Sequence, residues 1–146
     1  MTSSARACLL LLPLLSSALA SPVAAQAPRP GAIMGWWHGT STCVKASWNS
    51  ACNDEVTAYE FVPVSPDSMR STVHGFKIVA GQRDSMGDLP VSFVPDARVW
   101  NADFSTRRGD MRWSFQVHGD TLVGQLLHFP NRQVARHVLA VRGSGQ

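Results

Sequence analysis

Apolar and polar residues alternate one by one along most of this chain, in short runs that end at turn-forming residues. The clearest run, Met111 to His118, places Trp113, Phe115 and Val117 on one face and polar residues on the other. Successive side chains of a β-strand point to opposite faces, so this period of two is typical of strands that bury one face. The body shows no sustained helical period of 3.6. The pattern predicts an all-β domain.

Turn signals divide the alternating region into short strands. We expect strands at residues 34–44, 55–64, 70–80, 98–105, 111–118, 121–129 and 133–142, with shorter ones at 83–88 and 91–94. Gly87 and Pro90 break the two shorter strands. Eight or nine strands with frequent turns fit both a sandwich and a barrel. Sequential hairpins, such as the one at Gly119-Asp120, favour an up-and-down order. Closure removes exposed sheet edges, so we predict a closed antiparallel up-and-down β-barrel.

The first 25 residues have the layout of a secretory signal peptide. Arg6 precedes an apolar run at residues 7–15, and small residues follow that run. Cleavage is expected after Ala20 or Ala25, and the second position fits slightly better. Cys8 lies at the start of the apolar run rather than behind it, which argues against a lipid anchor. We therefore expect a secreted or periplasmic protein.

Three segments are expected behind this leader. Prolines make residues 26–32 an extended N-terminal segment, residues 33–142 form the β-barrel domain, and residues 143–146 form a disordered tail. A bilayer-spanning helix needs about 20 consecutive apolar residues, and no run in this chain approaches that length. A membrane span is therefore not expected.

Removal of the leader leaves Cys43 and Cys52 as the remaining cysteines. An oxidising compartment would join them, and the polar residues between them suit a loop. A disulfide of this span should stabilise the fold by roughly 2.5–3 kcal/mol. A catalytic cysteine or half of a metal site is the alternative, but neither fits a pair without neighbouring histidines. We predict a structural disulfide.

The chemistry-bearing residues form no familiar catalytic motif. The five histidines are spread over separate strands or strand ends. His128 and His137 could approach across the last hairpin as metal ligands, but exposed strand positions are the simpler interpretation. Glu55 and Glu60 should point to opposite faces, so they cannot form an acid–base pair. We expect no catalytic residue, no metal and no cofactor, and favour a non-catalytic protein, with an enzyme left as an alternative.

The chain carries 13 Lys and Arg against 10 Asp and Glu. The charges are scattered, apart from a group formed by Arg107, Arg108 and Arg112. A basic patch for nucleic acid is therefore not indicated. The Arg108-Gly109-Asp110 tripeptide is interpreted as a turn.

Gly35 and Trp37 form a Gly-x-Trp motif at the start of the first predicted strand. This motif resembles the first strand of the lipocalin-like (calycin) barrels, in which the tryptophan closes the base of the barrel. The resemblance also implies a basic residue on the last strand that packs over this tryptophan. Arg136 matches that position best, and Arg142 competes for it.

An eight-stranded barrel is just wide enough to be filled by its own side chains or to hold one small ligand. The residues predicted to line a ligand pocket are the aromatic ones expected to point inward, although packing of the core alone would also explain them: Trp37, Tyr59, Trp100, Phe104, Trp113 and Phe115. Trp36 faces the other way and Trp48 lies in the loop between the cysteines. These two are predicted to contact a protein partner or, alternatively, to cover an end of the barrel.

The expected function is non-catalytic binding of a small hydrophobic ligand by an exported protein. The alternative is a protein-interaction domain, such as an inhibitor of an exported protease. Bacterial metalloprotease inhibitors are similar in size and pattern, and the resemblance implies that residues 26–31 would enter the protease cleft. Those families begin with small polar residues, whereas this segment contains Pro28 and Pro30.

Overall fold

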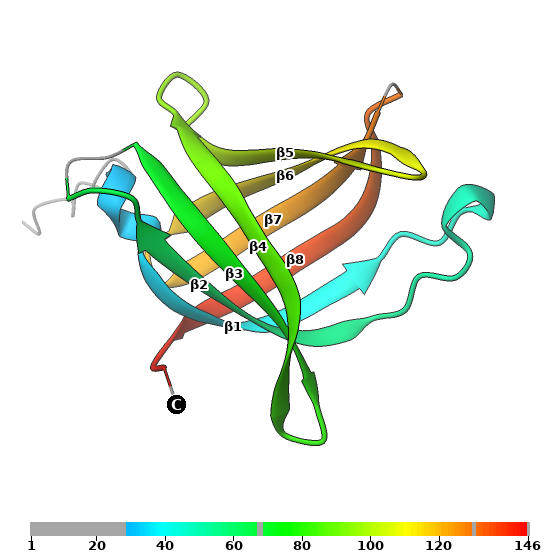
Figure 1. Cartoon of the computed structure of the whole chain (residues 1–146), viewed down its shortest axis with the longest axis horizontal. Coiled ribbons are helices and arrows are strands. Elements are labelled where there is room, and N and C mark those ends of the chain that lie inside the picture. Colours follow the sequence, from blue (N-terminus) through cyan, green and yellow to red (C-terminus); the bar gives the residue numbers. More distant parts are fainter. Residues whose placement is uncertain (1–28, 67–68, 130, 146) are drawn as a thin grey trace, which may run out of the picture.

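Eight strands form a closed antiparallel barrel in a computed structural model that describes residues 29–66, 69–129 and 131–145 (Figure 1). Each strand pairs with its neighbours in sequence, and the last strand returns to the first. The strands are β1 (Gly35–Cys43), β2 (Glu55–Pro63), β3 (Arg70–Val79), β4 (Gln82–Val94), β5 (Val99–Thr106), β6 (Gly109–His118), β7 (Thr121–His128) and β8 (Gln133–Gly143). The predicted all-β, up-and-down barrel is confirmed, and its strands number eight. The predicted leader, residues 1–25, lies outside the described residues.

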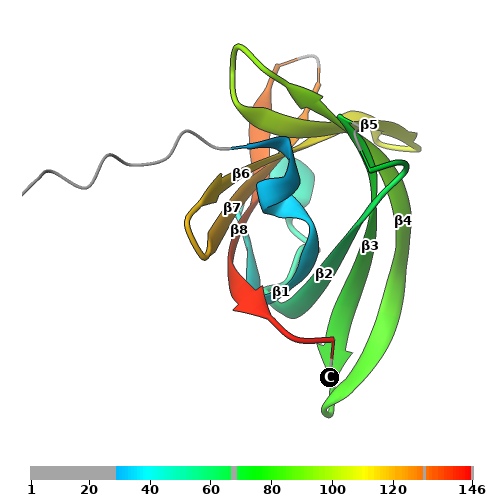
Figure 2. The same ribbon diagram turned by 90° about the vertical axis from the view of Figure 1, so that its left-hand side faces the viewer.

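Two short 3-10 helices complete the described part of the chain, η1 (Pro30–Ile33) and η2 (Ser47–Asn49). Figure 2 shows η1 lying across one end of the barrel. Its last residue, Ile33, is fully buried there. Residues 30–32, which were expected to be extended, therefore form most of this helix, and Ile33 behind them plugs this end of the barrel, which we call the base. Neither helix of this part has the length and apolar character needed to cross a membrane.

The β4 strand departs from the expected pattern, because it runs without a break through Gly87 and Pro90 for 13 residues. Two short strands were expected there. A bulge accommodates Gly87: Gly75 pairs with Gly87 and Phe76 with Ser85, which leaves Met86 as the extra residue. Pro90 is tolerated because only Ser92–Val94 of β4 pair with β5, so its missing N–H interrupts no ladder on that side.

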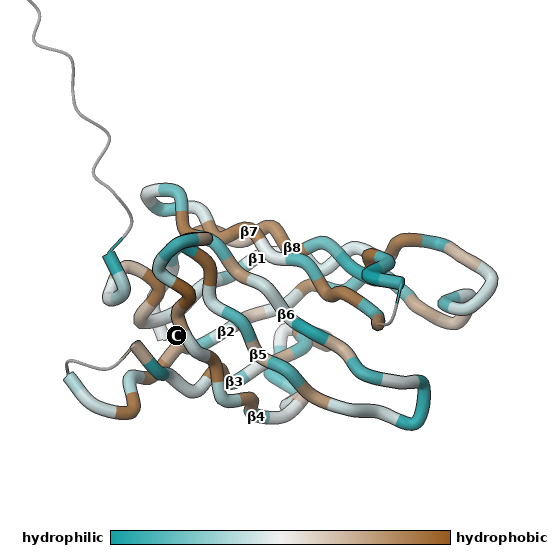
Figure 3. Tube along the Cα trace, turned by 90° about the horizontal axis from the view of Figure 1, so that it is seen from above, coloured by the Kyte–Doolittle hydropathy of each residue, from teal (hydrophilic) through white to brown (hydrophobic). Residues whose placement is uncertain are grey.

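The alternation of apolar and polar positions along the strands is visible in Figure 3. The inward positions near η1 hold large side chains, among them Trp37, Phe61 and Leu122, all at most 1% exposed. Phe115 is central to this core, since its ring lies 5.4 Å from Phe61 and 5.9 Å from Tyr59. The base half of the barrel is therefore filled by the protein's own side chains.

The chain end continues the barrel further than expected. β8 includes Gly143, and the Ser144 carbonyl accepts a hydrogen bond from the ring of His38 at 2.9 Å. These two residues belong to the folded domain rather than to a disordered tail. Gln146 lies outside the described residues.

Candidate ligand-binding site

The base of the barrel is closed by Trp37. Its indole N–H donates a hydrogen bond to the Ile33 carbonyl at 2.6 Å, which ties the core to η1. The guanidinium of Arg142 lies 4.2 Å from the centre of the Trp37 ring. Arg142 also donates hydrogen bonds to the carbonyls of Met34 and Ala32. The guanidinium, with both ends of its fork hydrogen-bonded, therefore covers the face of the fully buried Trp37 indole.

Of the two arginines considered as the partner of Trp37, the preferred one, Arg136, is wrong, and the alternative, Arg142, is the one that contacts the ring. The register between β1 and β8 places Trp37 opposite Arg142 and Cys43 opposite Arg136. Both arginines share the inward face of β8, so the alternation alone could not decide between them. Arg136 lies at the opposite end of the barrel, which we call the mouth.

Arg136 connects several elements at the mouth. Its Nη2 donates to the Glu55 carboxylate at 2.6 Å and its Nε to the Ser41 hydroxyl at 2.8 Å. Its Nη1 lies 3.2 Å from the sulfur of Cys52. The predicted Cys43–Cys52 disulfide is confirmed in the structure. Arg136, which is 13% exposed, therefore fixes β8 to β1, β2 and the loop that the disulfide closes.

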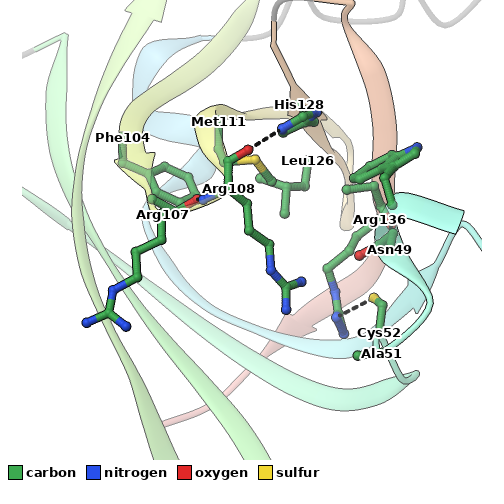
Figure 4. A pocket seen from close by; sticks show the side chains of 13 residues that line it. Asn49, Ala51, Cys52, Phe104, Arg107, Arg108, Met111, Leu126, His128 and Arg136 are labelled. Carbon is green, nitrogen blue, oxygen red and sulfur yellow. Dashed lines mark hydrogen bonds between the residues drawn. The ribbon is translucent and has the colours of Figure 1, made fainter. Parts of the chain in front are cut away.

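A cavity of about 460 Å³, here called the disulfide-loop cavity, lies beside Arg136 (Figure 4). It is half open to solvent and is bordered by the loop after β1, the β5–β6 hairpin, and the mouth ends of β7 and β8. Its apolar lining comes from Trp48, Phe104, Met111, Leu126 and Ala135. Its polar lining includes Arg107, Arg108, His128 and Arg136. A volume in this range is typical of pockets for small ligands.

The walls of this cavity are held together by specific contacts. The Trp48 ring stacks on His128, with 4.9 Å between ring centres. His128 donates from Nε2 to the Arg108 carbonyl at 2.7 Å, which links β7 to the β5–β6 turn. The buried Asn49 side chain donates to the carbonyls of Val44 and Ala135, each at 3.1 Å. The loop, the hairpin and the barrel wall are therefore fixed relative to one another.

A second cavity of about 260 Å³, here called the β4–β5 cavity, lies where β4 separates from β5. Its lining includes Tyr59, Met86, Leu89, Trp113 and Phe115. Phe104 lines both cavities, so the two adjoin at this ring. The disulfide-loop cavity lies at the mouth, whereas the β4–β5 cavity lies deeper, against Tyr59, Val73 and Phe115 of the core.

Two hydroxyl groups in this region lack partners. Tyr59 Oη and Thr57 Oγ1 are buried, and neither has a hydrogen-bond partner among the described protein atoms. Burial raises the pKa of Tyr59, and the nearby hydroxyls of Thr57 and Ser41 together with the positive charge of Arg136 offset only part of this effect. Tyr59 therefore presents a neutral phenol, and a buried hydroxyl without a partner costs roughly 1–3 kcal/mol.

The predicted pocket residues fall into two groups. Tyr59, Phe104, Trp113 and Phe115 line the β4–β5 cavity. Trp37 and Trp100 line neither cavity; they are 0% and 2% exposed and belong to the core. Gly35 opens β1 at the base with a φ of +98°, a conformation that favours glycine.

The two tryptophans predicted to contact a partner are both half-buried. Trp36 lies on the outer face, with the Arg83 guanidinium 4.2 Å from its ring centre and the Phe76 ring at 5.6 Å. Trp48 covers part of the mouth through its stack on His128. A protein partner at either residue stays a prediction.

Sequence reasoning missed several residues of the disulfide-loop cavity, notably Met111, Leu126 and His128. The feature of the sequence that pointed to this cavity was the group of positive charges that contains Arg107 and Arg108. His128 and His137 are not brought together, because His128 pairs with Gln133 and His137 with Gln125. Within the described ranges, no three His, Cys, Asp or Glu side chains are grouped to hold a metal ion.

No protein-family model matches the chain, and no curated protein matches it either. The eight-stranded antiparallel barrel is consistent with a calycin-like fold. A fold of this kind supports many functions, so the function must come from the cavities and the residues around them.

Proposed function

We propose that this protein is an exported, non-catalytic, lipocalin-like binding protein that takes a small hydrophobic ligand into the mouth of its barrel. The observation that carries the proposal is the pair of adjoining cavities of about 460 and 260 Å³, the first at the mouth and the second deeper, opposite a base filled by buried side chains. Concave, mostly apolar sites with a few fixed polar groups are the usual form of small-ligand pockets.

The lining supplies the driving force for binding. Phe104, Met111 and Leu126 form one continuous apolar wall in the disulfide-loop cavity (Figure 4). Burying roughly 200 Å² of apolar ligand surface would contribute about 5 kcal/mol before the costs of association are subtracted. Such a gain supports a ligand with an apolar body.

The fixed mouth lowers the cost of binding. The Arg136–Glu55 ion pair, the disulfide and the Asn49 hydrogen bonds hold the loop beside the cavity. A site whose walls are already ordered loses little conformational entropy when a ligand enters. The disulfide and the predicted leader both support export to an oxidising compartment.

The alternative function, protease inhibition through residues 26–31, has less support. Residues 26–28 lie outside the described part of the chain. Pro30 and Gly31 belong to η1, whose Ile33 is buried at the base. Pro30 and Gly31 are thus part of the base plug and not of a free extended strand.

A titration with the neutral, environment-sensitive dye Nile red tests the proposal on the exported, oxidised protein. We expect saturable binding, because the dye's apolar body can enter the mouth. Phe104→Ser should weaken it at least ten-fold, since this ring lines both cavities. Phe76→Ser is the matched control, because Phe76 contacts Trp36 on the outer face. Absence of saturable binding, or equal weakening by both changes, would overturn the proposal.

A further inference from the structure

Two arginines at the mouth lack an opposite charge. Arg107 and Arg108 form the turn of the β5–β6 hairpin, and both line the disulfide-loop cavity. Elsewhere Arg112 pairs with Asp103 at 2.6 Å, Arg136 with Glu55 at 2.6 Å and Arg142 with Asp120 at 3.4 Å. No acidic side chain among residues 29–66, 69–129 and 131–145 pairs with Arg107 or Arg108.

The backbone of this turn is fixed above the cavity. The Arg108 N–H donates to the Thr106 hydroxyl at 3.1 Å, and that hydroxyl donates to the Gly109 carbonyl at 3.1 Å. His128 holds the Arg108 carbonyl at 2.7 Å. Gly109 has a φ of +118°, and a Cβ there would lie only 3.1 Å from Nε2 of His128. The turn is therefore built to hold its two arginines beside the cavity.

The two guanidinium groups of the turn lie on different sides of the cavity. Figure 4 shows the Arg108 side chain extending toward Arg136, whereas the Arg107 side chain extends the other way, below Phe104. Arg136 pairs with Glu55 at 2.6 Å, and Lys77 approaches the same carboxylate at 3.8 Å, whereas Arg107 and Arg108 have no such partner among the described residues. The positive charge available to a ligand therefore comes from the hairpin turn.

From this arrangement we propose that the ligand is an amphiphile with a single acidic group on an apolar tail. The tail packs against Phe104, Met111 and Leu126, and the acidic group binds Arg107 and Arg108. The planar guanidinium fork binds carboxylate and phosphate oxygens in pairs, which an ammonium group cannot do. This inference rests on the proposed function and specifies the chemical class of the ligand.

The acidic group could belong to a free amphiphile or to a membrane lipid. The apolar wall lies inside the cavity, between the hairpin and the disulfide loop, and not on an exposed face. A bilayer surface cannot reach such a wall without releasing the lipid. The binding partner is therefore a free molecule in solution.

The test compares two probes with the same tail, dodecanoate and 1-dodecanol, by displacement of Nile red at low ionic strength. Dodecanoate should bind at least ten-fold more tightly than dodecanol. Arg107→Gln with Arg108→Gln should remove this advantage, so that dodecanoate binds no more tightly than dodecanol. The control, Arg29→Gln with Arg98→Gln, removes the same charge from exposed positions near the base and should preserve the advantage.

Each contrary result has its own meaning. Equal binding of both probes by the native protein would overturn the acidic-ligand inference and leave the proposed function standing. Binding of neither probe, and of no Nile red, would overturn the proposed function itself. Phosphatidylglycerol vesicles provide a further arm. Co-sedimentation that depends on Arg107 and Arg108, without dodecanoate binding, would replace the free amphiphile by a lipid surface. Added salt should reduce the advantage of dodecanoate, because exposed charges are screened.

Discussion

The base and the mouth of this barrel each use an arginine from the inward face of β8, with opposite results. At the base, Arg142 stacks on Trp37 and donates to the carbonyls around η1. At the mouth, Arg136 pairs with Glu55 beside the disulfide and borders a cavity of about 460 Å³. The same residue type thus completes a packed plug at one end and supports an open site at the other.

The difference follows from the inward residues of β1 and β2. Along β2 from base to mouth these are Phe61, Tyr59, Thr57 and Glu55, which become more polar toward the mouth. On β1 the large Trp37 at the base is followed by small residues toward the mouth. The backbones of β1 and β2 are uninterrupted strands from the base to the mouth. The size and polarity of the inward side chains therefore decide which end of a regular barrel stays open.

The largest expected effect comes from comparing the replacement of a tryptophan by alanine at the base with the same replacement at the mouth. Trp37→Ala should lower the free energy of unfolding by about 3–5 kcal/mol, because it empties a fully buried site. Trp48→Ala at the mouth should cost only about 1 kcal/mol, since it removes one half-buried ring stack. Denaturant unfolding measures both. Equal losses would show that the mouth is as much a core as the base.

The disulfide should matter next. Cys43→Ser with Cys52→Ser should lower the free energy of unfolding by about 2.5–3 kcal/mol, through greater freedom of the unfolded chain. It should also weaken Nile red binding, because the disulfide holds the loop beside the cavity and contacts Arg136 through the Cys52 sulfur. Arg142→Met is the comparison at the base: it should reduce stability and leave dye affinity of the folded protein unchanged. A disulfide loss with unaltered dye affinity would contradict the role assigned to the loop.

The smallest expected effect concerns Tyr59, the only tyrosine of the chain. Burial raises its pKa, so the unfolded state loses the phenol proton at a lower pH than the folded state does. Its contribution to stability is therefore complete below the pKa of the unfolded phenol and is lost as the pH rises above it. Tyrosinate absorbance of folded protein should appear at a higher pH than that of the denatured chain.

Tyr59→Phe provides the control for that titration. It should abolish the tyrosinate signal and raise the free energy of unfolding at neutral pH by about 1 kcal/mol, the lower end of the cost of a buried hydroxyl without a hydrogen-bond partner among the described atoms. Titration of the folded protein at the ordinary tyrosine pKa would show that Tyr59 is reached by solvent.

Particular residues show what could be predicted from the sequence. Alternation and turn residues were sufficient for the strands and the barrel, and the two cysteines for the disulfide. The partner of Trp37 was misassigned because Arg136 and Arg142 share a face, and only the register of β1 against β8 distinguishes them. Pro90 led us to expect a break in the strand. The strand accommodates this proline because the neighbouring strand β5 pairs only with Ser92–Val94 of β4, and the sequence does not reveal that short pairing.

The candidate site was less accessible to prediction than the fold. Tyr59, Phe104, Trp113 and Phe115 were expected to point inward, and they line a cavity. The disulfide-loop cavity depends on contacts between distant segments, such as Trp48 with His128 and Asn49 with Ala135. Such contacts leave no local pattern in a single sequence.

Methyl groups of methionine report on both ends of the barrel in one measurement. Met111 lines the disulfide-loop cavity and Met86 the β4–β5 cavity, whereas Met34 packs at the base beside η1. In a protein labelled with ¹³C at methionine methyl groups, titration with dodecanoate is predicted to shift the NMR signals of Met111 and Met86 and to leave Met34 in place. A shift of Met34 alone, or no shift at saturating dodecanoate, would contradict a binding site at the mouth.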